Sequence, residues 1–339
     1  MPTIKDVAKA SGVSETTVSF VFNNSGSVGL QTRARILEIA RQLQYSPSAV
    51  ARGLQRKRMD TLGIIFPEGL ESPITSPYYA AMVDSLFKAA SRRGQHILFF
   101  AGYDNPDAPE RVQIYRDGRC DGLLAFAQSR NSTLVEELQG FGVPLVLVND
   151  TREDPDISYI DVDNFEAAKQ MTAYLLDLGH SRIGFLGGDE VFNLVTQRRD
   201  GYRQALAERE IRYETALDIA GTFQPASVHE RVHAMMGLPA TMRPTAVVCC
   251  TDEMAISTLY ALQEIELRVP IDVSVVGFND APVAATATPP LTTVRQPMFE
   301  IGERAVEILL AQILGEIPAG SKIILPTDLI IRKSAAPIY

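Results

Sequence analysis

Basic side chains are concentrated in the first sixty residues, where they could contact phosphate groups. Residues 1–60 contain nine Lys or Arg and four Asp or Glu, so this stretch carries a charge of 9 − 4 = +5. The whole chain carries −9, which leaves −9 − 5 = −14 for residues 61–339. A basic segment on an acidic body is typical of a nucleic-acid-binding module joined to a domain with another task. The alternative is a solvated helical surface with a chance excess of charge. The basic residues are Lys5, Lys9, Arg33, Arg35, Arg41, Arg52, Arg56, Lys57 and Arg58.

Motifs for enzyme chemistry are weak or missing in the sequence. Gly184-x-x-Gly187-Gly188 differs from the GxGxxG pattern that cradles phosphate, and no Walker, HExxH or GxSxG motif occurs. His229 and His233 have a helical spacing that could present two imidazoles to a metal ion, but no third ligand is evident nearby. The sequence therefore predicts a protein that is not an enzyme and holds no metal or other cofactor.

The basic segment has the pattern of three short helices. Thr3 can cap a first helix that ends at Gly12, a residue able to adopt the left-handed conformation of a turn. Ser14 can cap a second helix from Glu15 to about residue 22, and a third helix is expected over about residues 31–43. Two small helices joined by a short turn form a helix-turn-helix, whose second helix can reach base edges in the major groove.

The same segment resembles a known family. Thr3-Ile4-Lys5-Asp6-Val7-Ala8, then Gly12-Val13-Ser14-x-x-Thr17-Val18-Ser19 and Asn23, are similar to the head of the LacI/GalR family of bacterial transcription regulators. Residues 45–54, Tyr-Ser-Pro-Ser-Ala-Val-Ala-Arg-Gly-Leu, resemble the hinge segment of that family. The resemblance continues along the whole chain. It implies an all-α, lambda-repressor-like head on a body with the periplasmic-binding-protein type I fold, two doubly wound parallel-sheet lobes.

The resemblance assigns DNA-binding roles in the head and hinge. Base-reading positions fall on Glu15, Thr16 and Phe20, and the family most often has arginine at the Phe20 position. Phenylalanine cannot make the bidentate guanine contact of arginine, so it either contacts a thymine methyl or packs against the hinge or third helix. Leu54 matches a leucine that wedges into the minor groove, although the hinge could instead be a flexible linker. The full set of expected DNA contacts is Thr3, Ser14, Glu15, Thr16, Thr17, Ser19, Phe20, Asn23, Ala51, Arg52 and Leu54.

The remaining chain alternates short apolar strands with helical stretches, which is typical of doubly wound parallel sheets. Strands are expected at 61–67, 96–100, 121–126, 143–149, 182–188, 246–250 and 274–278, with helices at about 78–93, 109–116 and from about 197. Two such halves in tandem place a ligand cleft at the carboxyl ends of the strands. The resemblance implies three crossings between lobes, expected near 160–164, 289–292 and 321–323. The expected domains are a head (1–46), a hinge (47–60) and a body (61–339), with an N-lobe of 61–160 and 291–321 and a C-lobe of 162–289 and 323–339.

Polar and aromatic residues at the strand ends are the candidates for ligand contact. Arg198 begins an Arg-x-x-Gly-aromatic motif, and the arginine of this motif contacts the effector in the family. Either Asn279 or Asp280 is expected to face the ligand. Aromatic faces together with amides, acids and an arginine suit a carbohydrate, and a nucleobase is the alternative. The expected contacts are Ser76, Tyr78, Tyr79, Gln128, Asn149, Asp163, Arg198, Phe223, Asp252, Asn279 and Asp280.

Length and composition indicate the number of domains and the cellular compartment of the protein. A chain of 339 residues is long enough for about two domains at roughly 150 residues each. Three cysteines, no export signal and no long apolar run predict a cytoplasmic protein. The head and the lack of an export signal argue against a stand-alone binding protein. The resulting hypothesis is a homodimeric repressor that binds a near-palindromic operator on double-stranded DNA, with no membrane partner. A small-molecule effector, most simply a sugar, would control its operator affinity allosterically.

Overall fold

The computed structural model describes residues 2–23, 25–46, 53, 58–67, 75–100 and 112–338. The chain divides into two compact units, which are residues 1–61 with 118–121, and residues 62–117 with 122–339. The hinge residues Ala51, Arg52 and Leu54, named above as DNA contacts, lie outside the described residues. In the part of the chain that is described, no helix is long and apolar enough to cross a membrane.

The first unit contains a helix-turn-helix, as the sequence predicts. Its helices are α1 (Ile4–Ser11), α2 (Glu15–Phe22) and α3 (Leu30–Gln42). Gly12 ends α1 with φ 66°, the left-handed conformation that glycine adopts without a Cβ clash. Ser14 caps α2 by accepting a hydrogen bond from the backbone of Thr17. One apolar side of each helix forms a small core of Val7, Ala8, Val18, Val21, Ile36 and Ala40.

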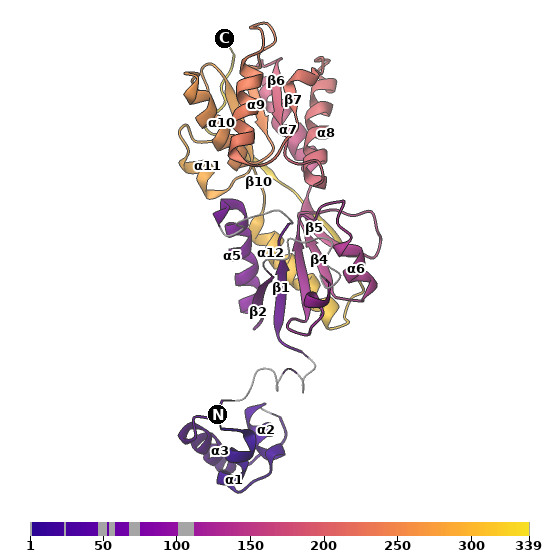
Figure 1. Ribbon diagram of the computed structural model, residues 1–339, viewed down its shortest axis with the longest axis vertical. Coiled ribbons are helices and arrows are strands. Elements are labelled where there is room, and N and C mark those ends of the chain that lie inside the picture. Colours follow the sequence, from indigo (N-terminus) through magenta and orange to yellow (C-terminus); the bar gives the residue numbers. More distant parts are fainter. Residues whose placement is uncertain are drawn as a thin grey trace. The chain divides into compact units, whose positions relative to one another are not determined.

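The N-lobe of the second unit is built on a six-stranded sheet in the order β11-β5-β4-β3-β1-β2. Helices α5 (Pro77–Arg92) and α12 (Met298–Ile313) pack against each other beside this sheet (Figure 1). Two further short helical elements are η2 (Gln113–Tyr115) and α6 (Leu134–Gly140). The strands are β1 (Thr61–Ile65), β2 (His96–Phe100), β3 (Gly122–Phe126), β4 (Leu145–Val148), β5 (Ser158–Val162) and β11 (Lys322–Leu325).

The C-lobe repeats this plan with a sheet in the order β12-β10-β9-β8-β6-β7. The pairs β6–β8, β8–β9 and β9–β10 are parallel, and β12 is antiparallel to β10. The strands are β6 (Ile183–Leu186), β7 (Asp218–Ile219), β8 (Ala246–Cys249), β9 (Ser274–Asn279), β10 (Thr292–Arg295) and β12 (Asp328–Ile330). The helices are α7 (Asn164–Asp177), α8 (Asn193–Glu208), α9 (Pro225–Met236), α10 (Asp252–Glu264) and α11 (Pro282–Thr286), with the 3-10 turn η3 (Thr215–Leu217) before β7.

The crossings between the lobes correct part of the sequence interpretation. The first crossing joins β5 to α7 and falls in the expected range of 160–164. The second follows β10 rather than preceding it, because Thr292–Arg295 pairs with β9 of the C-lobe before the chain returns. The third lies between β11 and β12, because Lys322–Leu325 still pairs with β5 of the N-lobe. The N-lobe therefore regains the chain at about Met298 and keeps it to Leu325, later than the expected 291 and 321.

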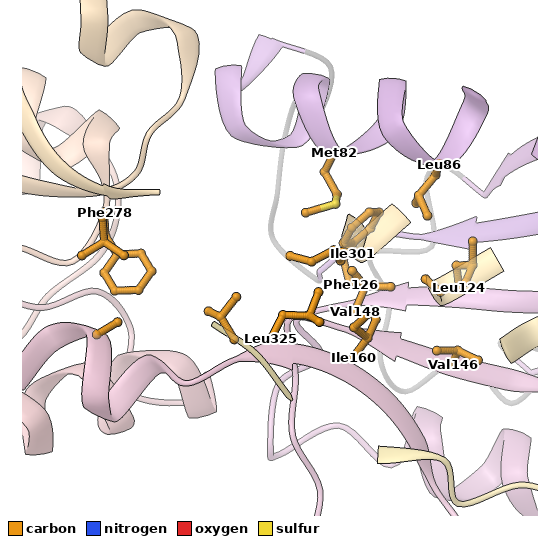
Figure 2. Close-up of a cluster of buried hydrophobic side chains, with 14 of the residues drawn as sticks. Met82, Leu86, Leu124, Phe126, Val146, Val148, Ile160, Phe278, Ile301 and Leu325 are labelled. Carbon is orange, nitrogen blue, oxygen red and sulfur yellow. The ribbon is translucent and has the colours of Figure 1, made fainter. Parts of the chain in front are cut away.

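One cluster of buried apolar side chains extends through both lobes, and a second cluster lies within the C-lobe. In the N-lobe, Met82 and Leu86 of α5 and Ile301 of α12 pack toward Phe126 of β3 and the neighbouring strands (Figure 2). The strand side chains in this cluster include Leu124, Val146, Val148 and Ile160. Phe278, at the end of β9, lies apart from them in the same view. Burying such side chains fixes the two sheets, so the polar residues at the strand ends are held on rigid supports.

Candidate functional sites

The exposed face of α2 and its C-terminal end carry the three residues expected to read bases and two more of the expected DNA contacts. Val18 and Val21 are buried in the core of the head, which turns the opposite side of the helix outward. Glu15, Thr16, Ser19, Phe20 and Asn23 line one hollow of about 540 Å³, together with Ile4 and Ser25. The structure therefore brings five of the expected residues to one concave face. Ile4 and Ser25 were missed, because nothing in the sequence indicates that α1 and the loop after α2 border this face.

The remaining head residues have local roles at the helix starts. The Oγ atoms of Ser14 and Thr17 lie 2.8 Å apart, and Ser14 also accepts the Thr17 backbone hydrogen bond. Thr3 donates to the Asp6 carboxylate through both its backbone N–H and its hydroxyl, each at 2.8 Å. These contacts fix the starts of α1 and α2. Helix N-termini of this kind attract phosphate, which is compatible with the positioning role expected for Thr3, Ser14 and Thr17.

Arg198 belongs to α8 in the second unit and is only 3% exposed. Its Nε donates to Oδ1 of Asn164 at 2.9 Å and its Nη1 donates to the Cys250 carbonyl at 2.5 Å. Its Cζ lies 3.5 Å from the centre of the Phe278 ring, a cation–π contact. The guanidinium is thus held in one orientation.

The rest of the arginine motif explains how α8 is placed. A Cβ at Gly201 would collide with the Phe165 carbonyl, so only glycine lets α8 approach α7 this closely. Tyr202 is buried and donates its hydroxyl to the Ile183 carbonyl of β6 at 2.8 Å. These two residues position Arg198 without facing the cleft.

A chain of three buried amides connects the lobes. Asn149, directly after β4, donates through Nδ2 to Oε1 of Gln296 at 2.8 Å. Gln296 donates through Nε2 to Oδ1 of Asn279, at the end of β9, at 2.7 Å. In the described structure, Oδ1 of Asn149 is buried and has no hydrogen-bond partner. An unsatisfied buried acceptor is costly, so this atom is a natural position for a ligand donor.

Glu253 of α10 makes a second contact across the cleft. Its Oε1 accepts from Oγ of Ser76 at 3.1 Å and from the backbone of Tyr78 at 3.3 Å. Ser76 therefore faces the C-lobe, as a cleft position should. Tyr79 packs instead in the N-lobe core, with its ring centre 5.9 Å from that of Phe66 and 5.7 Å from that of Phe126. Burial raises the pKa of both Tyr78 and Tyr79 above the ordinary range of tyrosine.

Asp161 is a buried acid that the sequence interpretation passed over in favour of Asp163. It accepts from the Val162 backbone at 2.7 Å and from Nδ2 of Asn164 at 3.2 Å, which links it to Arg198 through Asn164. Desolvation by burial raises the pKa of Asp161 to about 7. Asp163 caps α7 and lines a groove of about 780 Å³ at the junction of the lobes, with Asn193, Gln197 and Lys322 among its neighbours.

Two acids expected to contact the ligand are directed elsewhere. Asp252 is fully buried within the C-lobe and accepts from the Ala281 backbone at 2.8 Å and from Thr293 at 2.5 Å. Burial raises its pKa to about 8. Asp280 is held between Arg295 and Arg332, at 2.7 and 2.6 Å. Asp252 and Asp280 are thus held by partners of the C-lobe, whereas Asn279 belongs to the interlobe network.

Two other expected residues make contacts within their own lobes. Gln128 turns its Nε2 toward the Phe126 carbonyl at 2.6 Å, so this donor is already used within the N-lobe. Phe223 packs against Gly188, at the end of β6, with its ring centre 6.0 Å from that of Phe192.

The histidine pair contacts Glu264, with His229 at 3.2 Å and His233 at 3.6 Å. Within the described residues, no cluster of His, Cys, Asp and Glu is suited to hold a metal ion.

A helix-turn-helix head and a two-lobed α/β body with a polar groove at the junction of its lobes are typical of a DNA-binding protein that also binds a ligand. Residues 3–48 match the lacI family of bacterial regulatory proteins, and residues 172–335 match a periplasmic binding protein-like domain. The HTH-type transcriptional repressor PurR of Haemophilus influenzae (strain PittEE) is 32% identical over 342 residues, covering 100% of both chains.

Solved structures agree with this match. A complex of the transcriptional regulator CelR with cellobiose is 30% identical, covers 98% of this chain and 100% of its own, and has a TM-score of 0.76. The lac repressor dimer bound to operator and the anti-inducer ONPF is 26% identical, covers 99% of both chains and has a TM-score of 0.84. The chain belongs to the lacI family of bacterial regulatory proteins and is a DNA-binding transcriptional repressor with a ligand-binding body. Members of this family are regulators of transcription and not enzymes.

Proposed function

We propose that a small carbohydrate is the effector of this repressor and that it binds in the cleft between the lobes. The observation that carries the proposal is the buried amide chain of Asn149, Gln296 and Asn279, with the unpaired Oδ1 of Asn149. A sugar hydroxyl both donates and accepts hydrogen bonds, so it can satisfy such an acceptor and a neighbouring donor together. Arg198 adds a planar fork of donors that suits adjacent hydroxyls.

The aromatic side chains favour a sugar over a nucleobase. A nucleobase needs an open ring face to stack on, but Tyr79 packs into the N-lobe core and the Phe278 face is covered by Arg198. Tyr78 and Tyr79 meet at an angle of 72°, with ring centres 5.1 Å apart, so the two rings do not form a flat surface on which a base could stack. The CelR relative with bound cellobiose supports the same ligand class.

The DNA-binding face belongs to a homodimer in this proposal. The face of α2 formed by Glu15, Thr16, Ser19, Phe20 and Asn23 reads the major groove, while Thr3, Ser14 and Thr17 contact phosphates. The head covers residues 1–46 and a hinge covers 47–60. The likeness to the lac repressor dimer on operator DNA supports two heads on a near-palindromic site.

Ligand control follows from the two contacts that join the lobes. A molecule bonded to Asn149 and Arg198 favours the closed arrangement, in which Gln296 bridges the lobes and Glu253 reaches Ser76. A ligand that binds one lobe arrangement better than another shifts the equilibrium by that difference in affinity. In a dimer, this shift changes the energy of placing both heads on one operator.

Affinity selection of fragmented genomic DNA on the purified full-length protein tests the proposal. We expect enrichment of a few near-palindromic sites, and we expect one member of a panel of mono- and disaccharides to change their retention. Nucleobases are included in the same panel. Response to a nucleobase alone would overturn the carbohydrate effector, and failure to enrich any site, with or without metabolites, would overturn the operator-binding arrangement proposed for α2.

A further inference from the structure

Phe20 is an exposed aromatic residue on the side of α2 proposed to face DNA, and its ring lies against Gly26. The residue is 41% exposed and lines the same hollow as Glu15 and Thr16. A Cβ built at Gly26 would lie 2.8 Å from Cδ2 of Phe20, 3.0 Å from Cγ and 3.2 Å from Cε2. The ring therefore occupies the space that a side chain at position 26 would need.

The loop after α2 is held against the end of the helix. The backbone N–H of Ser25 donates to the Phe20 carbonyl at 3.0 Å, and Gly26 has φ 69°. This left-handed conformation brings the bare Cα of Gly26 under the ring. One side of the Phe20 ring is thus fixed by the loop, while the rest stays open toward the hollow.

We propose that Gly26 is a positioning residue for base recognition, and that it directs the Phe20 ring onto the C5-methyl group of a thymine in each operator half-site. The inference rests on the proposed role of α2 as the helix that reads the operator. In the major groove only thymine presents a methyl group, whereas guanine, cytosine and adenine present polar atoms at the corresponding edge. A phenylalanine ring cannot pair with those polar atoms, so it selects an A·T pair at this position.

The size of the preference follows from the area of one methyl group. Burying a methyl-sized group contributes a factor of about four in affinity, from roughly 0.8 kcal/mol per buried carbon. With one contact in each half-site of a two-fold operator, the two factors multiply to about fifteen. This effect is specific to one base position, which distinguishes it from a general loss of head stability.

Two steps locate and test the contact with the full-length protein. Operators are selected from a randomised library with the wild type and with Phe20→Arg. The operator position at which the preferred base changes from thymine to guanine is the position that Phe20 contacts. Deoxyuridine, which lacks only the methyl group, then replaces thymine at that position in both half-sites. We expect wild-type affinity to fall about fifteen-fold and Phe20→Ala to bind both operators equally. Equal wild-type affinity for thymine and deoxyuridine would overturn the methyl contact.

Gly12 provides a matched control for the role of Gly26. Both glycines have nearly the same positive φ, 66° and 69°, so alanine strains the backbone equally, but nothing lies within 4 Å of a Cβ at Gly12. We expect Gly26→Ala to lose the discrimination between thymine and deoxyuridine and Gly12→Ala to keep it, with similar thermal stability of the two variants. Retained discrimination in Gly26→Ala would overturn the positioning role while leaving the proposed function intact. If no operator is enriched by the wild type at all, the proposed function fails first.

Discussion

Gln296 is the middle residue of the amide chain between the lobes, and replacing it with leucine removes both hydrogen bonds at nearly constant volume. The change strands two buried groups, Nδ2 of Asn149 and Oδ1 of Asn279, which Gln296 now satisfies at 2.8 and 2.7 Å. Each stranded buried group costs about 1–3 kcal/mol, so closure of the lobes is weakened by about 2–6 kcal/mol. Even the lower figure reduces the equilibrium constant for closure about 30-fold, because 1.4 kcal/mol is a factor of about ten.

Hydrogen–deuterium exchange measures this opening without knowledge of the ligand. In Gln296→Leu we expect faster exchange in peptides that cover residues 148–150 and 278–281, where the two stranded groups lie. Gln312→Leu is the matched control, because Gln312 donates to Ser158 at 2.5 Å within the N-lobe and contacts neither end of the amide chain. It should leave both cleft peptides at the wild-type rate.

If Gln296→Leu exchanges like the wild type in both peptides, the amide chain does not hold the lobes together. The effector's influence on operator binding must then depend on other contacts. A variant that exchanges faster throughout the C-lobe would instead show that Gln296 stabilises that lobe alone. Either outcome would remove Gln296 from the coupling between the lobes.

The other predictions concern the arginine, the buried acid and the second interlobe contact. Arg198→Ala should abolish the effect of ligand on operator binding while ligand-free operator affinity persists, as a titration of operator retention with the effective sugar would show; a normal response would exclude Arg198 from the site. The pKa of Asp161 is raised by burial to about 7, above its unfolded value, so its protonated form is favoured by folding and stability declines as pH rises from about 4 to 7. A pKa raised by about three units corresponds to at most about 4 kcal/mol of stability. In Asp161→Asn, the free energy of unfolding in urea should therefore decline less between pH 4 and 7 than in the wild type. An unchanged decline would show that Asp161 is not the group responsible. Glu253→Ala should lower ligand affinity about 5- to 30-fold, because it removes a charged acceptor worth about 1–2 kcal/mol, and calorimetry measures this change. Unchanged affinity would show that the contact with Ser76 does not favour closure.

Much of the molecule could be predicted because local signals agree with the final packing. Caps at Ser14 and a left-handed turn at Gly12 determine where α1 and α2 end and begin, and the spacing of Val18 and Val21 determines which face of α2 is exposed. Apolar runs predicted most strands to within two or three residues. The expected helix start near 197 was four residues late, since α8 begins at Asn193 after a polar turn without a strong capping signal.

The role of Gln296 was missed because its segment gives no clear strand signal and its partner Asn149 lies 147 residues away in the sequence. Gln296 follows β10, a strand whose buried Thr292 and Thr293 are polar, so the segment lacked the apolar run that marks the other strands. For the same reason, the second crossing was expected too early.

For acidic residues near strand ends, the sequence alone does not show which way the carboxylate points. An acid after a strand can face a ligand or turn toward a partner in its own lobe, and only the fold decides between these states. Thr293 lies 41 residues from Asp252 and Arg332 lies 52 residues from Asp280, and these partners hold both carboxylates within the C-lobe. Asp161 has the opposite arrangement, because its neighbours Ile160 and Val162 face the core and direct it toward Arg198 through Asn164. Strict alternation along β5 would have identified Asp161, which lies within the strand, in preference to Asp163, which lies beyond its end.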